Sequence, residues 1–510
     1  MASDNKVIAK NTVFLYIRML VTMVISLYTS RVVLQVLGVD DYGIYQAVGG
    51  IVGFLSFLNN ALSSGTSRFL TFELGAGDKK KLEDTFSTTL TVHILLALII
   101  VFLGETIGLW YFNNKMVIPP DRFDASTVVF HLSMLTAIIN IVTVPFNATI
   151  IAHERMKVFA YVGVVDALSK LAVVYALMIG GIDKLVLYAI LLFLVQLAIF
   201  LFYVFYCRAS FEETKYKFLI DKEQFRKIFS FSSWSLLAGG SIALNSQGIL
   251  LLLNLFFTPA VVTARAISLL VYNTTIQFMN NFRTAVNPQI VKQLAAGDVE
   301  GSHKLLLQST KFSYYLMLIL CLPICLLASP ILHLWLVEVP EYTVIFLQLV
   351  IIQCLFQVFD TSFYTALYAK GRIRENALVS PMVGFIRFPA VYLLFRMGFS
   401  PLALSWTSII TYALLGLIIK PILITKIADY TWKEVLSTMQ VCFFVTLIAI
   451  PIPIAAYMML NVEGNLWHAS FVLLLCLTCV AASVWFLGLT KNMKQMLQDA
   501  VLTRIHFIRE

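Results

Sequence analysis

The chain has 510 residues, of which 59% are hydrophobic and only 13% are charged, and its formal net charge at pH 7 is +9. Soluble domains carry about 25% charged residues, so this composition excludes a water-facing surface and indicates a membrane protein. The Lys and Arg residues are spread over many connections and form no basic domain. This distribution argues against nucleic acid as a partner.

Long apolar runs recur along the whole chain. A helix needs about 20 apolar residues to cross a hydrocarbon core of roughly 30 Å, and we count fourteen such runs. Barrel strands are excluded because they alternate apolar and polar residues over about ten positions, whereas these runs are continuous. The predicted spans cover residues 10–37, 41–66, 85–112, 125–151, 158–180, 184–207, 232–257, 260–287, 309–336, 342–369, 377–397, 401–425, 435–460 and 467–489.

The basic residues predict the orientation of these spans. With the first residue inside, the even-numbered connections carry most of the Lys and Arg, including Lys79, Lys217, Lys292 and Lys420. The positive-inside rule then places both termini in the cytoplasm. The polar start precedes a span too long for a signal peptide, so we expect no cleaved leader. The connections on the other side are short, so we expect the function to lie within the bilayer.

Sequence motifs for cofactors and catalysis are missing from the chain. There is no GxxxxGK[ST] loop for ATP, no HExxH metal motif and no Gx[ST]xG nucleophile. Cys476 and Cys479 have the spacing of a redox or metal pair, but they stand mid-helix in the last span without a second pair. Such cysteines pack as small hydrophobic residues. We therefore expect no cofactor, no metal and no catalytic residue, and the chain is not predicted to be an enzyme.

An internal repeat relates the two halves of the chain. Residues 74–78 (LGAGD) match 294–298 (LAAGD), and residues 152–157 (AHERMK) match 369–374 (AKGRIR). Chance similarity between Leu-rich helices explains matches of Leu and Val, but it explains matches of Gly and charged residues poorly. The offset corresponds to six spans, an even number, so the two copies enter the membrane in the same direction.

The repeat predicts an all-α, polytopic fold of two six-helix lobes related by a pseudo-twofold axis along the membrane normal, with two accessory helices at the C-terminus. Two such lobes around a midplane cavity form a transporter architecture. The predicted divisions are an N-lobe at 1–207, a cytoplasmic linker at 208–231, a C-lobe at 232–426, and accessory helices with a tail at 427–510.

Polar stripes follow several of the predicted helices. In the first span Asn11, Arg18, Thr22, Ser26 and Thr29 share one face at 100° per residue. In the eighth span Arg265, Tyr272, Arg283 and Asn287 share a face, and the two arginines lie about 27 Å apart along the helix at 1.5 Å per residue. Each stripe is predicted to line a central lumen.

Two further stripes coincide in the repeat. Four polar residues share one face of the fourth span, and four share one face of the tenth span. The two sets match position for position at an offset of 217 residues. Interhelical hydrogen bonding is the alternative role for such neutral residues, whereas the shared register favours lumen lining. The two quartets are Thr136, Asn140, Thr143, Asn147 and Gln353, Gln357, Asp360, Tyr364.

Other ionisable residues leave two interpretations open. Asp166 and Lys170 stand four apart, so a purely structural ion pair is the alternative to a lumen role. Lys170 corresponds in the repeat to Arg387. Arg31 lies near the outer end of its span and opposite the polar stripe, where it can snorkel to headgroups or pair structurally instead of binding substrate.

The deeply placed charges are mostly cationic. A cationic, water-filled cavity concentrates an anionic ligand, and the planar guanidinium fork suits phosphate. The sequence therefore predicts a membrane-associated anion, such as a phosphate-bearing lipid, as the substrate. The cations are Arg18, Arg31, Lys170, Arg265, Arg283 and Arg387, set against Asp166 and Asp360.

The first two spans resemble a known family. Lys10-Asn11, the segment 31–45 (RVVLQVLGVDDYGIY) and the Gly-Asp connection after span two are similar to the bacterial polysaccharide (O-antigen type) flippases. That family shares a superfamily with multidrug antiporters and the lipid II flippase. The resemblance extends over spans one to twelve, mostly at the level of hydropathy.

The resemblance implies an alternating-access flippase of the bacterial inner membrane. It would move undecaprenyl-diphosphate-linked oligosaccharide to the periplasmic leaflet for surface polysaccharide, with polymerase machinery as a possible partner. The chain departs from the family pattern in span seven, where Asn245, Gln247 and Asn254 stand without the usual acid. That departure puts ion coupling at this span in doubt and leaves Asp360 and Asp166 as its candidates.

Two alternatives remain open. The first is a cation-coupled multidrug antiporter of the same fold that uses Asp360 or Asp166 as its proton site. Drug-antiporting relatives usually place an acid in span one, where this chain has Arg18. The second is a membrane-embedded glycan polymerase, ligase or acyltransferase, which the short outer connections disfavour.

Overall fold

The computed structural model describes residues 2–55, 57–153, 155–178, 181–217, 240–241, 243–371, 373–490 and 494–495. Every regular element in these ranges is a helix, which confirms the all-α prediction. In the first half these elements are α1 (Ala2–Leu37), α2 (Val39–Leu55), α3 (Phe57–Ala76), α4 (Lys79–Leu103), η1 (Gly104–Gly108), α5 (Leu109–Lys115), η2 (Pro120–Arg122), α6 (Phe123–Ala152), α7 (Met156–Ala176), α8 (Lys184–Ser210) and η3 (Glu212–Thr214).

The second half continues in the same way. Its elements are η4 (Leu244–Gly248), α10 (Ile249–Phe256), α11 (Pro259–Ala295), α12 (Val299–Leu326), α13 (Ala328–Trp335), α14 (Thr343–Ala369), α15 (Ile373–Arg396), α16 (Ala403–Leu414), η5 (Leu415–Ile419), α17 (Lys420–Ile427), α18 (Trp432–Ala449), α19 (Pro451–Met459), α20 (Leu466–Ser483) and η6 (Val484–Gly488).

Helices occupy the described parts of all fourteen predicted spans. Ten segments of the described chain are long and apolar enough to cross a membrane. The four other predicted spans correspond to α2 with α3, to the shorter apolar helix Leu244–Phe256, to α11 and to α15. The count of fourteen membrane spans therefore stays a prediction beyond these ten.

The same helix start follows the second span of each repeat. Asp78 caps α4 by accepting a hydrogen bond from the backbone N–H of Lys81, and Asp298 caps α12 by accepting one from Gly301. The preceding Gly77 and Gly297 have φ angles of 76° and 83°, a conformation that closes a helix C-terminus and favours glycine. In both copies of the repeat, therefore, the Gly ends one helix and the Asp caps the next.

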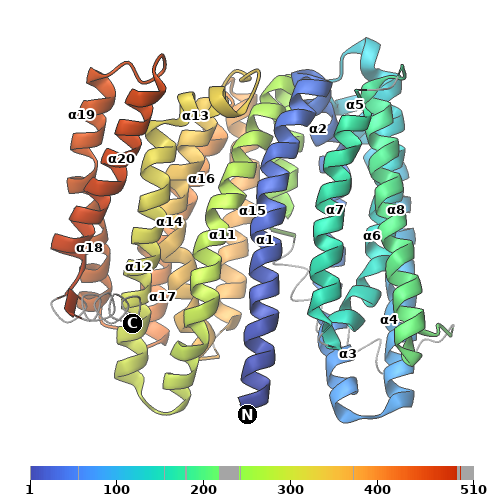
Figure 1. Ribbon diagram of the computed structural model, residues 1–510, viewed down its shortest axis with the longest axis horizontal. Helices are drawn as coiled ribbons and strands as arrows, with labels where there is room; N and C mark the ends of the chain where they lie inside the picture. Colours follow the sequence, from blue (N-terminus) through green and yellow to red (C-terminus); the bar gives the residue numbers. More distant parts are fainter. Residues whose placement is uncertain are drawn as a thin grey trace, which may run out of the picture. The chain divides into compact units, whose positions relative to one another are not determined.

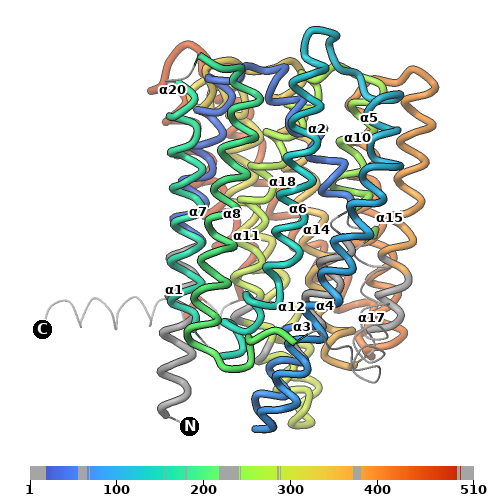
Figure 2. The backbone as a smooth tube through the Cα atoms, turned by 90° about the vertical axis from the view of Figure 1, so that its right-hand side faces the viewer, coloured from blue at the N-terminus to red at the C-terminus, as the bar shows by residue number. Residues whose placement is uncertain are grey.

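The chain forms two compact units. The first comprises Met1–Ala266, Leu336–Glu341 and Pro381–Pro401, and the second comprises Ile267–Trp335, Tyr342–Ser380 and Leu402–Glu510. The division into repeat lobes at 1–207 and 232–426 remains a prediction. Within each unit the long helices run alongside one another (Figures 1 and 2).

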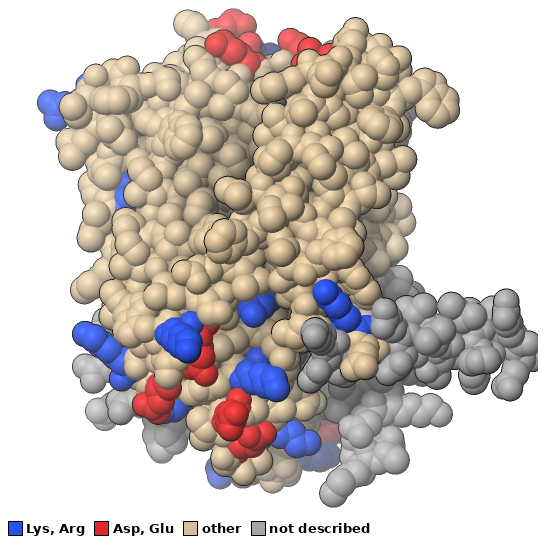
Figure 3. All heavy atoms as spheres, turned by 90° about the vertical axis from the view of Figure 1, so that its left-hand side faces the viewer, with Lys and Arg blue, Asp and Glu red and all other residues tan. Residues whose placement is uncertain are grey.

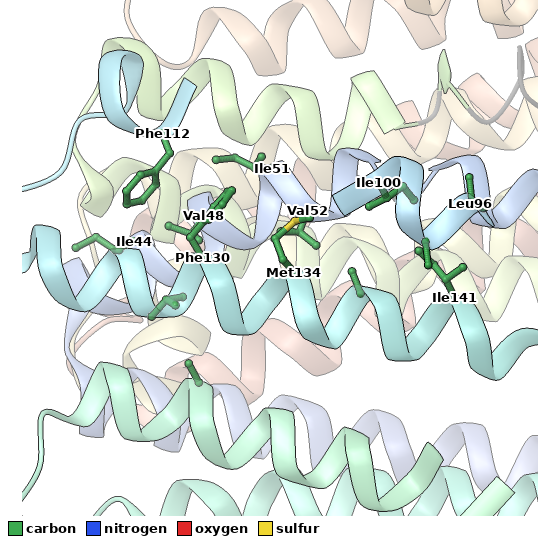
Figure 4. Packing of buried hydrophobic residues seen from close by; sticks show 14 of the residues in the cluster. Ile44, Val48, Ile51, Val52, Leu96, Ile100, Phe112, Phe130, Met134 and Ile141 are labelled. Atoms are coloured by element: carbon green, nitrogen blue, oxygen red, sulfur yellow. The ribbon is translucent and has the colours of Figure 1, made fainter. Parts of the chain in front are cut away.

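The first unit is built around α6. Helices α2, α3, α4, α7 and α8 all contact it, and α1 packs along α7. Its buried centre joins α2, α4, α5 and α6 through side chains such as Val48, Ile100, Phe112 and Phe130 (Figure 4). Every one of these helices supplies an apolar face, so burial of that face fixes how the helices pack.

The second unit is built around α12 and α14, which pack against each other. Helices α16 and α17 cover α14, and the C-terminal helices α18 and α20 pack on α12. On the face that carries α18–α20, Lys, Arg, Asp and Glu gather mainly near the lower end, with a few acidic and basic residues toward the upper end. The broad middle band is nearly free of them (Figure 3). This distribution fits a bilayer-facing surface.

Candidate transport site

Helices α11 and α14 are joined in the second unit by hydrogen bonds between residues of two predicted stripes. The hydroxyl of Tyr272 donates to Oε1 of Gln357 over 2.7 Å. Gln353, one turn earlier on α14, is buried. Tyr272 and Gln357, one residue from each predicted stripe, therefore form an interhelical contact, and lumen lining by the two stripes stays a prediction.

Arg283 of α11 binds several residues of α14. Its Nη1 donates to Ser362 Oγ at 2.5 Å, and its Nη2 donates to Thr365 Oγ1 at 2.6 Å and to the backbone carbonyl of Ser362 at 3.2 Å. Asn287 Oδ1 lies 3.4 Å from Nη2. Its buried Nε–H has no acceptor among the described residues, and the side chain is only 3% exposed.

All of these partners of Arg283 are neutral. A buried guanidinium normally faces a carboxylate, because a desolvated charge is costly unless it is paired. Hydroxyl and carbonyl oxygens stabilise the cation, but they leave its charge uncompensated. Among the contacts of the described residues, then, Arg283 keeps a net positive charge inside the second unit.

Asp360 pairs with a residue that sequence reasoning had assigned to a connection. Lys420, counted there among the cytoplasmic loop lysines, begins α17 and is only 2% exposed. Its Nζ lies 3.3 Å from Asp360 Oδ1 and 5.5 Å from the ring centre of Tyr364. Counting Lys420 among the loop residues was wrong: it lies within the predicted span 401–425, where an acid on another helix meets its charge.

The fourth-span stripe lines a cavity within the first unit. Thr136 and Asn140 of α6 form part of its wall, together with Tyr45 and Gly49 of α2 and Leu192 of α8. The cavity has a volume of about 220 Å³. Asn147, two turns further along α6, has a buried Oδ1 without a hydrogen-bond partner among the described residues. Asn140 is thus exposed at this cavity, and its place in a central lumen stays a prediction.

The Asp166–Lys170 pair is present. Lys170 Nζ donates to Asp166 Oδ2 at 2.7 Å, and both side chains are only partly exposed. The i, i+4 spacing predicted this ion pair directly. A role of this pair in transport stays a prediction.

The other predicted site residues fall into three groups. Arg265 and Arg387 are buried within the first unit, and Arg31 is half-buried. On α1, Thr22 donates to its own helix at Met19 O over 3.1 Å, and Ser26 is exposed. The side chains of Asn11 and Arg18 lie outside the part of the chain that the structure describes.

Two of the polar residues in span seven bind backbone. Asn254 accepts from the Val117 N–H at 3.1 Å and donates to its carbonyl at 3.2 Å. Asn245 donates to Ser241 O of its own helix at 2.8 Å. These contacts give Asn254 a structural role in holding the 116–118 connection.

Sequence reasoning missed one charged cluster at the end of the first unit. Arg122 donates to Asp41 at 2.8 Å through Nε, and to both carboxylate oxygens of Asp183 through its Nη atoms. Asp183 also caps α8 by accepting from the N–H of Leu185 and Val186. The partners are 81 and 61 residues from Arg122 in sequence. No local spacing could have signalled the cluster.

Comparisons with known proteins agree with this fold. A family model described as MatE matches residues 15–176, and no curated protein matches the chain. A multidrug resistance MATE family transporter of the MOP superfamily, in its inward-facing conformation, is 14% identical with a TM-score of 0.68. That match covers 82% of this chain and 99% of the other.

Two further solved structures extend the comparison. The lipid II flippase MurJ, in an inward closed conformation, is 11% identical with a TM-score of 0.69, and the match covers 93% of this chain and 98% of that one. A MOP superfamily transporter from Pyrococcus furiosus, described by the reverse polarity of its binding pocket, is 15% identical with a TM-score of 0.58. It covers 83% and 97% of the two chains.

The chain has the fold of the MOP-superfamily transporters, and its first third carries a MatE match. The expected superfamily fold is thereby confirmed. The narrower resemblance to the polysaccharide flippases stays a prediction, because multidrug and lipid-flipping proteins share this fold at similar identity.

Proposed function

We propose that this protein is a flippase that moves undecaprenyl-diphosphate-linked oligosaccharide across the bacterial inner membrane by alternating access. The observation that carries the proposal is the uncompensated charge of Arg283, held by Ser362 and Thr365 within a membrane-spanning helix bundle. The shared fold with MurJ, itself described as a lipid II flippase, supports a lipid-linked substrate.

A cation inside the membrane costs several kcal/mol unless an opposite charge or carbonyl groups compensate it. An intramembrane arginine is therefore a functional-site candidate by default. The five N–H donors of a guanidinium match phosphate oxygens, and the Nε–H of Arg283 is not used by any described residue. A diphosphate brings the negative charge that the bundle around Arg283 lacks.

The other predicted cations would bind the diphosphate before or after it reaches Arg283. Arg18, Arg31, Lys170, Arg265 and Arg387 would attract the diphosphate along its route. We also propose the orientation that the loop charges predict, with both termini in the cytoplasm and substrate entering from that side.

A second candidate function rests on the Asp360–Lys420 pair. Intramembrane carboxylates serve as proton or cation sites in transporters, and the multidrug transporters of this fold make an antiporter the alternative. In the flippase interpretation the same pair, or Asp166, would couple an ion to transport.

The test expresses this chain in a bacterial strain whose own polysaccharide flippase is deleted, and the wild-type chain is expected to restore surface polysaccharide. We expect Arg283→Met to abolish surface polysaccharide at unchanged membrane abundance. Lys79→Met is the matched control, because Lys79 pairs with Glu212 on the exposed surface. Normal polysaccharide with Arg283→Met, or drug resistance without polysaccharide in the wild type, would contradict the proposal.

A further inference from the structure

The cavity in the first unit differs in chemistry from the Arg283 region. It is lined by α2, α6 and α8, and no described residue of its wall is Asp, Glu, Lys, Arg or His. A neutral wall offers nothing to balance a phosphate or a drug cation. Its ligand should therefore carry no charge.

The wall nevertheless carries polar groups that can bind a ligand. The side chains of Ser133 and Asn140 have no hydrogen-bond partner among the described residues, and Asn140 is exposed to the cavity. The Thr136 hydroxyl donates to its own helix at Leu132 O, which leaves its oxygen as an acceptor. Hydroxyl and amide groups together present both donors and acceptors, as a polyhydroxylated ligand requires.

An aromatic ring and a glycine complete the wall. The ring of Tyr45 is held edge-on by Tyr188, with centroids 4.9 Å apart and an interplanar angle of 61°. A fixed aromatic ring provides a flat apolar surface for the C–H face of a sugar. At Gly49 an added Cβ would meet no atom within 4 Å, so this helix surface is open.

From these contacts we infer that the cavity is a subsite for one uncharged sugar ring of the transported oligosaccharide. The inference rests on the proposed flippase function and adds to it the class of headgroup recognised. At about 220 Å³ the cavity is smaller than the roughly 300–1,000 Å³ of a site for a drug-sized ligand. It has room for a single sugar ring, and the rest of an oligosaccharide would lie outside it.

The experiment measures binding to the purified full chain in lipid nanodiscs. The probes are undecaprenyl diphosphate without sugar and the same lipid carrying glucose, galactose, N-acetylglucosamine or glucuronic acid. At least one neutral sugar should tighten binding by roughly tenfold over the bare lipid, the value of one or two hydrogen bonds. Glucuronic acid should give no gain, because the wall has no cation.

Two variants and a control locate the effect. Gly49→Leu places a side chain in the cavity, and its Cβ would have no protein atom within 4 Å. Asn140→Ala removes the exposed amide. Each should remove the gain from sugar and leave binding of the bare lipid unchanged. Gly75→Leu adds the same side chain at an open, exposed position of α3 and should change neither.

The outcomes separate the two proposals. If bare and sugar-bearing lipids bind the wild type equally, or if Gly49→Leu and Asn140→Ala leave the gain intact, the sugar subsite is overturned while the flippase function stands. If no undecaprenyl diphosphate binds at all, the proposed function itself fails. Strong glucuronic acid binding that Asn140→Ala abolishes would replace the neutral-sugar assignment.

Discussion

Lys420 and Asp360 form an ion pair between α17 and α14, with Nζ 3.3 Å from Oδ1. The lysine is almost completely buried, and the π-helical turn Leu415–Ile419 directly precedes it. Gly416 in that turn approaches α14 so closely that an added Cβ would lie 2.6 Å from the Phe356 carbonyl oxygen. The two helices are therefore fixed at contact distance where the charges meet.

Removal of one partner of this pair should be strongly destabilising. Asp360→Asn or Lys420→Met leaves the other charge buried, at an expected cost of about 3–5 kcal/mol in the free energy of unfolding. The double variant should recover most of that loss, because no charge then stays unpaired. Unfolding by SDS in mixed micelles measures all three, and equal losses in the single and double variants would contradict a paired role.

Arg283→Lys should impair transport although it conserves charge. A lysine ammonium cannot donate to Ser362 and Thr365 with the fixed fork of a guanidinium. The loss of one charge-assisted hydrogen bond predicts a decrease of at least about tenfold in flipping rate. The rate is measured in proteoliposomes with a fluorescent polyprenyl-diphosphate sugar. Thr365→Ser, which keeps the hydroxyl acceptor, is the control and should remain near the wild-type rate.

Gly43 of the YGIY motif should not accept a side chain. A Cβ at Gly43 would lie 2.1 Å from the Pro259 carbonyl oxygen and 2.8 Å from Thr263 Oγ1, so backbone would have to move. Gly43→Ala is therefore expected to destabilise the protein by about 1–3 kcal/mol, the usual cost of overpacking. Gly75→Ala, at an open helix position, should be neutral or slightly stabilising. A stable Gly43→Ala protein would show that α2 and the start of α11 can separate.

Asp183 gives a prediction for the pH dependence of stability. Burial raises the pKa of this carboxyl, but hydrogen bonds from Arg122 and from the α8 N–H groups outweigh burial and lower it below its usual 3.8. Because the folded-state pKa is depressed, its stabilisation is present above about pH 4 and is lost as the pH falls through the lowered value. Asp183→Asn keeps an N-cap residue but removes the charge.

The measurement is the thermal unfolding midpoint in detergent between pH 3 and 7. The wild-type midpoint should decrease below about pH 4, and the Asp183→Asn midpoint should decrease less there while being lower at pH 7. Asp121→Asn on the neighbouring exposed turn serves as the control. Parallel curves for wild type and Asp183→Asn would contradict a charged Asp183–Arg122 contact.

Several site features followed from local spacing. The Asp166–Lys170 pair, and the sharing of one face by the polar residues within α11 and within α14, depend only on the helical period, which is the same in every helix. The Gly-Asp helix starts at Gly77-Asp78 and Gly297-Asp298 follow from backbone chemistry, which is also local. For these features the sequence was sufficient.

The partners of isolated charges did not follow from the sequence. Arg122 contacts acids 81 and 61 residues away, and Lys420 contacts Asp360 from a different helix. The positive-inside count took Lys420 as a loop residue although the predicted span 401–425 contains it, because a count of basic residues cannot show a partner on another helix. Only the packing of helices decides whether an acid stands close enough to balance it.

The sequence by itself determined the all-helical membrane class, the repeat and the cationic bias, because composition, helical period and capping residues act within a few turns of chain. The tertiary structure decided which charges are matched. It paired Lys420 with Asp360, surrounded Arg283 with neutral acceptors and left a cavity without charged residues beside Asn140. Whether a charge is matched depends on contacts between helices far apart in sequence. Burial in those contacts determines the free energy of each charged side chain.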